Sequence, residues 1–537
     1  MKTVELLDCT LRDGAYCIDG KFGAKSIGGI IRNLQVANVK IIECGWLKNS
    51  PHEYGTTYYQ VPDELSQYLQ VPKSKFSTYV AMIDYNQYNC EQLPQCNGET
   101  IDAIRIVFPK DKVKEGLALV EPIRKKGYGV YLQAANTLGY SDSELLELVK
   151  EVNNVKPDGL AIVDTFGAMY PNDLIRMVRL IHNSLDKNIN IGFHAHNNQQ
   201  LAFSLGMKFI EEFIDTSERG IIIDSSLCGM GRGAGNTPTE LLANYINTMY
   251  DNNYDMNVIM DAVDMHMLQY MHNSTWGYSI PYSIAGMYCC HVNNVAYLTK
   301  THRTRNKDIK MVFEMLDKNA RTTYDYEHLD KIYADYQNKE IDDSEIKKVL
   351  QEKFSKKTVL AILPGKTAME EQELIKTYKK NNNVIVVGIN SVLEGFEYDW
   401  LFFSNSVKYT YAKENYNEQF TKAFKIISSN IKTNSETREY IVNYNDLQKR
   451  EWKYYDNSMI MFLRLMSILQ LSDVKIAGFD GYKGNGQYAE QVLHPELLPK
   501  EKQLLEDEIF DMLKDFVRLN GNKIHLEYIT KSPFEII

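Results

Sequence analysis

Residues 3–245 repeat one pattern eight times, in which a short apolar run rich in β-branched residues is followed by a longer polar or amphipathic segment. The eight runs are TVELLDC, VKIIECG, STYVAMID, AIRIVF, GVYLQAA, GLAIVD, INIGFHAH and GIIIDSS. Apolar runs that alternate with helix-length segments are typical of a parallel sheet. Eight such units over about 240 residues predict an α/β fold, a (β/α)8 TIM barrel, with a doubly wound open sheet as the alternative.

The length and charge of the chain limit the classes of protein to which it can belong. Its 537 residues suffice for a barrel of about 250 residues and a second domain of roughly 200. With 60 basic and 70 acidic residues and no long Lys or Arg run, we expect no nucleic-acid partner. The start MKTVELLDCT lacks a long apolar segment and no stretch of about 18 uncharged apolar residues occurs, so we expect a cytoplasmic protein with no membrane partner. The eight cysteines have no CxxC spacing, which favours reduced thiols over disulfides or a zinc ribbon.

Polar side chains follow the predicted strands at the points where the strands end. They are Asp8, Arg12, Asp13, Glu43, Gln133, Asp164, His194, His196 and Asp224. In a barrel the carboxyl ends of the strands meet at one face, which carries the active site. Buried charges are costly unless they are paired or bound to a metal, so this ring of polar residues indicates an active site.

His194 and His196 lie two residues apart in the seventh predicted strand. Side chains i and i+2 of a strand point the same way, so both imidazoles can reach one ion; hydrogen bonds to neighbours are the alternative. Asp13 can add a carboxylate, because the first, seventh and eighth strands adjoin where a barrel closes. Two neutral imidazoles and a carboxylate suit a divalent metal such as Mn, Zn, Co or Fe, whereas Mg prefers more oxygen ligands.

Five motifs in order resemble one superfamily. They are LLDCTLRDGAY, IIECG, VDTFGAMYPNDL, FHAHNN and CGMGRGAGNTPTE. They resemble the pyruvate-carboxylate-type metallolyase barrels, which include 4-hydroxy-2-oxovalerate aldolase, 3-hydroxy-3-methylglutaryl-CoA (HMG-CoA) lyase and the isopropylmalate and homocitrate synthases. The resemblance covers residues 1–300 and implies a TIM barrel that binds a divalent metal. Manganese is the metal we expect first, with Mg, Zn and Co as alternatives.

The resemblance implies a set of metal ligands. Asp13, His194 and His196 match the ligands of the family. Asn236, in GAGN, matches a residue that completes the metal shell in the lyase branch only. A turn residue in a Gly-rich loop is the alternative for Asn236.

Other residues are expected to act beside the metal. Arg12 matches the arginine that stabilises a developing enolate, and a fixed guanidinium next to a metal would disperse oxyanion charge. Glu43, Gln133 and Asp164 are expected to orient the ligands or the substrate. For Glu43 and Asp164, a buried ion pair is the alternative.

The sequence departs from the family directly after LRDG. The aldolases carry a histidine there that serves as the base, and the synthases carry a Glu-Gln pair, whereas this chain has Ala15, Tyr16 and Cys17. Tyr16 is therefore a candidate for proton transfer, provided that a nearby cation and the metal lower its pKa. Tyr288 and His291 are candidate acids, because IAGMYCCHVNN is similar to the aldolase segment after the barrel. For each of the three, the alternative is an aromatic side chain that only packs against its neighbours.

The pattern changes in the second half of the chain. Residues 301–355 predict a helical linker, and residues 356–537 predict a Rossmann-like α/β domain that begins with a strand, a Gly loop and a helix, TVLAILPGKTAMEEQELIKTYKK. That loop and helix N-terminus could hold an anion. PGKT is not expected to be a nucleotide-hydrolysing loop, since the motif requires glycine where Leu360 stands. The domain weakly resembles sugar-nucleotide or pyrophosphokinase-like domains; a scaffold or dimerisation domain is the alternative.

The residues and the resemblance together imply a divalent-metal-dependent aldolase or lyase. It would make or break a C–C bond through a pyruvate-type enolate of a 2-oxo acid, with an aldehyde as the other substrate, in surface-polysaccharide or sugar metabolism. One alternative is an acyl-CoA-dependent Claisen condensing enzyme, disfavoured by the missing Glu-Gln pair. Another is a non-catalytic barrel that serves a C-terminal nucleotide-sugar-type domain, disfavoured by intact Asp13, His194 and His196. The sequence leaves the aldehyde and a homo-oligomeric state open.

Overall fold

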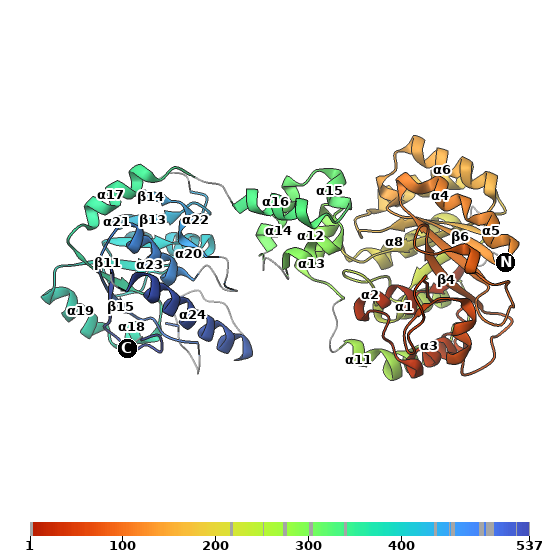
Figure 1. Ribbon diagram of the computed structural model, residues 1–537, viewed down its shortest axis with the longest axis horizontal. Helices are drawn as coiled ribbons and strands as arrows, with labels where there is room; N and C mark the ends of the chain where they lie inside the picture. Colours follow the sequence, from red (N-terminus) through yellow and green to blue (C-terminus); the bar gives the residue numbers. More distant parts are fainter. Residues whose placement is uncertain are drawn as a thin grey trace. The chain divides into compact units, whose positions relative to one another are not determined.

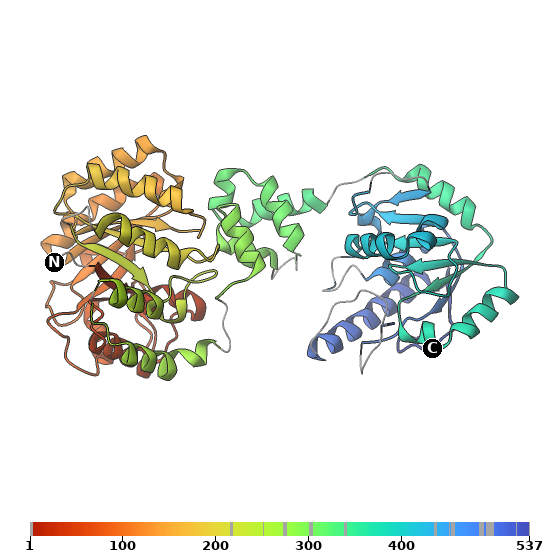
Figure 2. The ribbon, with the colours of Figure 1, turned by 180° about the vertical axis from the view of Figure 1, so that it is seen from behind.

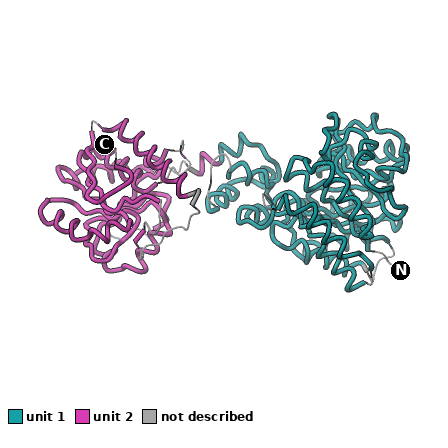
Figure 3. Tube along the Cα trace, turned by 90° about the horizontal axis from the view of Figure 1, so that it is seen from below, with its two compact units in different colours: residues 1–332 teal, residues 333–537 magenta. Residues whose placement is uncertain are grey.

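The structure is a computed structural model that describes most of the chain. The described residues are 4–214, 219–250, 252–271, 276–299, 304, 306–337, 341–433, 438–449, 452, 457–482, 488–489, 499–521 and 523–535. Contacts divide the chain into two compact units, residues 1–332 and 333–537 (Figure 3). The expected linker, whose first residues 301–303 lie outside the described part, is therefore divided between the two units.

Eight parallel strands of the first unit close into a barrel. They are β1 (Val4–Asp8), β2 (Ile41–Leu47), β4 (Thr78–Asp84), β5 (Ala103–Phe108), β6 (Gly129–Ala134), β7 (Gly159–Asp164), β8 (Asn190–Ala195) and β9 (Ile221–Ser225). The sheet runs β1-β9-β8-β7-β6-β5-β4-β2, and β1 also pairs with β2, which closes the ring. A two-residue strand, β3 (Tyr58–Tyr59), is added beside β2. The closed ring confirms the predicted TIM barrel and excludes the open sheet.

Helices cover the outside of the barrel (Figures 1 and 2). They are α3 (Ala24–Val36), α4 (Val113–Ala118), α5 (Val120–Lys125), α6 (Asp142–Val155), α7 (Pro171–Ser184), α8 (Ala202–Ile214), α9 (Thr239–Tyr250) and α10 (Met256–Ala262). A capping box is present at α6, where the Ser141 side chain accepts from the Glu144 N–H and the Glu144 carboxylate accepts from the Ser141 N–H. Among the described helices, none combines the length and apolar character needed to cross a membrane.

The barrel interior changes from apolar to charged along the strands. Strand residues and Cys9, which directly follows β1, form an apolar cluster of Leu7, Cys9, Ile41, Val80, Ala103 and Ile222. Glu43, Arg105 and Asp224 each lie two residues further along β2, β5 and β9, so they face the same interior one step nearer the carboxyl ends. All three are buried. The charged layer therefore lies directly beneath the barrel mouth.

Short helices follow the barrel. They are α11 (Leu268–Met271), α12 (Ile280–Met287), α13 (Val292–Tyr297), α14 (Asn306–Met315), α15 (Lys318–Thr322) and α16 (Tyr326–Gln337). The residues of α14 and α15, expected in the linker, pack with the first unit: Phe313 of α14 is fully buried, and the backbone N–H of His291 donates to the carbonyl of Arg321 in α15. These helices thus belong with the segment that carries His291.

The second unit is built on a seven-stranded parallel sheet in the order β14-β13-β12-β11-β10-β15-β16. The strands are β10 (Thr358–Ile362), β11 (Val384–Ile389), β12 (Trp400–Phe403), β13 (Phe424–Ser428), β14 (Glu439–Val442), β15 (Asp473–Ala477) and β16 (His525–Tyr528). Apolar side chains of α17 (Ser344–Phe354), α23 (Ser458–Ile468) and α24 (Pro499–Asn520) pack on one face. Those of α18 (Lys366–Glu370), α19 (Gln372–Asn381), α20 (Ser406–Asn415) and α21 (Asn417–Lys422) pack on the other. This arrangement confirms a second α/β domain with a parallel sheet, in which the short helix α22 (Tyr444–Leu447) follows β14.

The Gly loop after β10 meets a carboxylate of its own chain. The strand order changes direction between β10 and β15, which is where ligands bind in doubly wound sheets. There Asp480 Oδ2 accepts from the Thr367 N–H at 2.9 Å, and its Oδ1 accepts from the Thr367 hydroxyl. Thr367, at the helix N-terminus that could hold an anion, is therefore paired with Asp480.

Candidate metal centre and active site

The segment after β1 places Arg12 and Asp13 at the barrel mouth. β1 ends at Asp8, and the chain then forms the single turn of α1 (Thr10–Asp13), followed by α2 (Ala15–Ile18). Asp8 Oδ1 accepts from the Thr10 N–H at 2.9 Å, and the Thr10 hydroxyl accepts from the Leu227 N–H at 2.8 Å. These bonds tie the turn to β1 and to the loop after β9. Arg12 and Asp13 are both buried.

The structure brings Asp13, His194 and His196 together. One ligand atom from each of the three buried side chains lies within 4.8 Å of the others. The nearest oxygen of Asp13 lies 3.8 Å from His196 Nδ1, and the centroids of the two imidazole rings are 5.1 Å apart. His194 lies in β8 and His196 directly after it, so the i, i+2 relation directs both rings to the same place. The three residues could hold a divalent cation.

The atoms left without partners fit such a cation. His194 Nδ1 lies 2.9 Å from Asp224 Oδ2, which fixes the ring and leaves Nε2 available as a ligand. His196 Nδ1 and Asn236 Oδ1 are buried and have no hydrogen-bond partner. The Asn236 amide nitrogen donates to Asp13 Oδ2 at 2.6 Å, so this side chain orients the carboxylate while its oxygen remains free.

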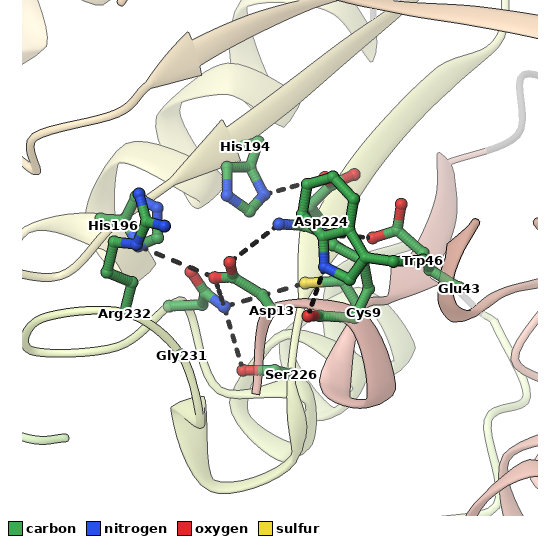
Figure 4. A network of polar contacts seen from close by, with 12 residues as sticks. Cys9, Asp13, Glu43, Trp46, His194, His196, Asp224, Ser226, Gly231 and Arg232 are labelled. Carbon is green, nitrogen blue, oxygen red and sulfur yellow. Dashed lines mark hydrogen bonds and ion pairs between the residues drawn. The ribbon is translucent and has the colours of Figure 1, made fainter. Parts of the chain in front are cut away.

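A chain of charged side chains supports two of these ligands from behind (Figure 4). Arg12 Nη1 donates to Asp13 Oδ1 at 2.8 Å, and its Nε donates to Glu43 Oε2 at 2.7 Å. Arg105 Nη1 donates to the same Glu43 oxygen at 2.9 Å, and Nη2 donates to Asp224 Oδ2 at 2.5 Å. Three carboxylates and two guanidinium groups leave one net negative charge, so a divalent cation would make the centre positive toward an anionic substrate.

The charge states suit metal binding. Burial by itself would raise the pKa of Asp13, but the charges of Arg12, His196 and His194 hold it well below its ordinary value. Burial lowers the pKa of His196 to about 4, and Asp13 offsets this only in part. Burial also opposes ionisation of Asp224, yet Arg105 and His194 lower its pKa. At neutral pH the group therefore offers ionised carboxylates and a neutral His196 imidazole, the forms that bind metals.

Gln133 and Asp164 occupy different surroundings. Gln133 of β6 lines a small internal cavity with Arg105 and Asp224. The Asp164 carboxylate accepts from the backbone N–H groups of Ala168 at 2.9 Å and Met169 at 3.1 Å, so it shapes the loop after β7. Burial raises the pKa of Asp164 to about 6, and these two donors offset the rise only in part.

The three candidates for proton transfer do not lie together. Tyr16 lies edge-on to Trp46 at 5.9 Å between ring centroids and beneath Arg232, whose Cζ is 3.8 Å from the centroid of its ring. His291 faces the same arginine, with 3.4 Å between its Nε2 and Arg232 Nη1. Tyr288 instead donates its hydroxyl to Glu314 at 2.7 Å, on the helices that follow the barrel.

The pKa of Tyr16 bears on its role in proton transfer. Nearby cations are present, but desolvation of the phenol by the surrounding protein, although Tyr16 is 42% exposed, raises its pKa above the ordinary value, and Arg232 and Arg12 do not offset this. A tyrosine with a raised pKa remains protonated at neutral pH. Tyr16 is thus suited to donate a proton, and the tyrosinate that forms would take a proton back in the reverse step.

Two arginines near the centre had not been singled out from the sequence. Arg105 stands in AIRIVF, where a single cation among apolar residues was the available signal, because Ala103 and Arg105 share one strand face. Arg232 stands in the motif CGMGRGAGN, where it is the single cation among glycines and small residues. Neither contact could be derived from spacing, since each joins residues far apart in the chain.

Asp8 should make the stability of the barrel depend on pH. Its carboxylate also accepts from the Thr239 hydroxyl at 2.6 Å, and burial raises its pKa from 3.8 to about 6. The folded state therefore holds this proton more tightly than the unfolded state. The Asp8 contribution should lower the free energy of unfolding by roughly 1–3 kcal/mol as pH rises from about 4 to about 6. Hydrogen exchange of β1 peptides against pH, in wild type and Asp8→Asn, measures this difference; parallel curves would contradict it.

The first unit is a TIM barrel with an Asp-His-His group at the carboxyl ends of its strands, the face at which TIM-barrel enzymes carry their active sites. Residues 107–266 match the family model described as HMGL-like. The 4-hydroxy-2-oxovalerate aldolase of Geobacillus genomosp. 3 is 28% identical over 270 residues, which are 49% of this chain and 76% of the relative. That of Pectobacterium atrosepticum is 25% identical over 318 residues, which are 57% of this chain and 89% of the relative.

Solved structures are also similar to the barrel. HMG-CoA lyase from Brucella melitensis aligns with a TM-score of 0.38 at 12% identity, covering 49% of this chain and 96% of that one. The family-model and sequence matches confirm that the first unit resembles the HMGL-like metallolyases. They also support an aldolase or lyase that depends on a divalent metal.

Proposed function

We propose that the barrel is a divalent-metal-dependent aldolase that makes or breaks a C–C bond next to a 2-oxo acid such as pyruvate. The observation that carries the proposal is the buried Asp13, His194 and His196 group at the barrel mouth, together with the similarity to 4-hydroxy-2-oxovalerate aldolases. Asp13, His194, His196 and the Asn236 oxygen would hold the metal, with manganese expected first. A divalent cation bound there supplies Lewis acidity toward the keto oxygen of the 2-oxo acid.

Other residues of the chain would stabilise the enolate, deliver the proton and position the metal ligands. Arg12 is held by Asp13 and Glu43 in a fixed orientation, so its guanidinium can disperse the charge of the developing enolate oxygen. Tyr16, with its raised pKa, would deliver the proton at the reacting carbon or oxygen. Glu43, Arg105 and Asp224 would keep the ligands in place. The other substrate would be an aldehyde, and sugar or surface-polysaccharide metabolism is the proposed setting.

Proton exchange into pyruvate tests this function without knowledge of the aldehyde. Elemental analysis by mass spectrometry should find one divalent metal ion per chain in the purified protein. In deuterium oxide the manganese-loaded protein should exchange the methyl protons of pyruvate, as measured by proton NMR. Protein that binds no divalent metal and exchanges no protons would rule the proposal out. Metal binding without exchange would favour an acyl-CoA condensing enzyme over an aldolase.

A further inference from the structure

Arg232 is a cation at the barrel mouth. Among the described residues it has no carboxylate partner; its contacts are the Tyr16 ring, 3.8 Å away, and His291 Nε2, 3.4 Å away. By contrast, Arg12 and Arg105 are each paired with two carboxylates. A partly buried guanidinium has lost hydration that no protein anion replaces, which favours an anion from a ligand.

His291 presents a second donor to the same place. Its Nδ1 accepts a hydrogen bond from the Asn293 backbone N–H at 3.1 Å. Burial lowers the pKa of His291 to about 3, so the ring is neutral and its single proton must lie on Nε2. Nε2–H therefore faces Arg232 Nη1, also a donor, at 3.4 Å. Two N–H donors that converge without an acceptor fit an oxygen atom of an anion.

Arg232 and Arg12 lie on opposite sides of the candidate metal centre. In Figure 4, Arg232 lies with His196 on one side of Asp13, and Glu43 and Trp46 lie on the other. Arg12 donates to Glu43, so its guanidinium lies on the Glu43 side. A 2-oxo acid bound in the centre would thus have its enolate on the Arg12 side. The aldehyde that reacts with it would lie on the Arg232 side.

Lys48 adds positive charge to the mouth. Its Nζ lies 4.7 Å from the centroid of the Trp46 ring, and its pKa is lowered by burial and, more weakly, by the charge of Arg232. Asp84 acts in the opposite direction on the same lysine. Arg232 and Lys48 together make the entrance attractive to anions.

We propose that Arg232 and His291 bind an oxyanion, a carboxylate or a phosphate, carried by the aldehyde that reacts with the 2-oxo acid. This inference rests on the proposed function and names the class of its second substrate: a charged aldehyde and not a simple alkyl aldehyde. It assigns His291 to binding and leaves Tyr16 as the proton donor. The anion would accept from Arg232 Nη1 and His291 Nε2 at once, which explains why the two donors face each other.

Matched aldehydes test the proposal with the full chain. Condensation with pyruvate is measured for glyceraldehyde 3-phosphate against glyceraldehyde, and for succinic semialdehyde against butyraldehyde. The wild type should prefer the charged member of at least one pair by about tenfold or more in kcat/KM. The pair that shows the preference tells phosphate from carboxylate. In Arg232→Gln the preference should fall below about threefold, and Arg232→Lys should retain part of it. Arg179→Gln, at an exposed arginine of α7, is the matched control and should keep the full preference.

Calorimetry gives a readout that does not depend on turnover. Glycerol 3-phosphate and butyrate are the probes, and the favoured anion should bind at least about tenfold more weakly to Arg232→Gln than to the wild type. The inference would be overturned if the wild type had equal kcat/KM for charged and neutral aldehydes. It would also be overturned if Arg232→Gln lowered kcat/KM equally for both. If the wild type fails to exchange pyruvate protons, the proposed function falls, and binding of these probes still decides whether the anion site exists.

Discussion

Replacing His194 with alanine is expected to remove the bound divalent metal and, with it, proton exchange into pyruvate. His194 is one of the three residues of the candidate metal group, and its ring is held 2.9 Å from Asp224. Removing a residue that hydrogen-bonds to a metal ligand typically lowers metal affinity or activity by about 10–100-fold. Removing the ligand itself should lower them further. Elemental analysis and exchange of the pyruvate methyl protons measure both quantities on one sample.

Two further variants sharpen this experiment. Asp224→Asn keeps the His194 ring but changes the group that fixes it, so we expect an intermediate loss of about 10–100-fold. His525→Ala, at an exposed histidine of the second unit, is the matched control and should retain metal and exchange. Full metal content and unchanged exchange in His194→Ala would show that the Asp13, His194 and His196 group is not the metal centre.

Replacing Arg105 with methionine is expected to destabilise the barrel more than any surface change. Arg105 is only 2% exposed, and it pairs with both Glu43 and Asp224. Its removal leaves the buried Glu43 with Arg12 as its one cation and the buried Asp224 with His194 alone, and breaking a buried pair in this way typically costs about 3–5 kcal/mol. Hydrogen exchange of peptides from β5 and β9 reports the opening free energy of this unit alone, which is needed because a chain of two units does not unfold in one step.

An exposed arginine provides the comparison for Arg105. Arg179 of α7 pairs with Glu212 while its side chain is 67% exposed, so Arg179→Met should change the stability by less than about 1 kcal/mol. If the two methionine variants were equally stable, the pairs of Arg105 with Glu43 and Asp224 would not support the barrel. Metal content of Arg105→Met adds a second readout, because Asp224 also holds His194.

The local pattern of the chain predicted the barrel and much of its centre. Each of the eight apolar runs became a strand, because alternating helix-length segments bury both faces of such runs. The i, i+2 spacing of His194 and His196 directs both rings to one side, whatever the rest of the fold does. Asp13 could be added because barrel closure places β1 beside β9 and near β8. The roles of these residues in metal binding and catalysis stay predictions.

Only the tertiary structure decided which distant charges meet. Periodicity tells which face of β5 carries Arg105, but the closure and stagger of the barrel bring it to Glu43 and Asp224. Likewise, the helices after the barrel carry Tyr288 to Glu314 and His291 to Arg232. The sequence by itself determined the strands, their inward faces and the candidate ligands, because these follow from short-range spacing. The ion pairs behind the ligands and the contacts of Arg232 with Tyr16 and His291 join residues far apart in the chain, which no local pattern specifies.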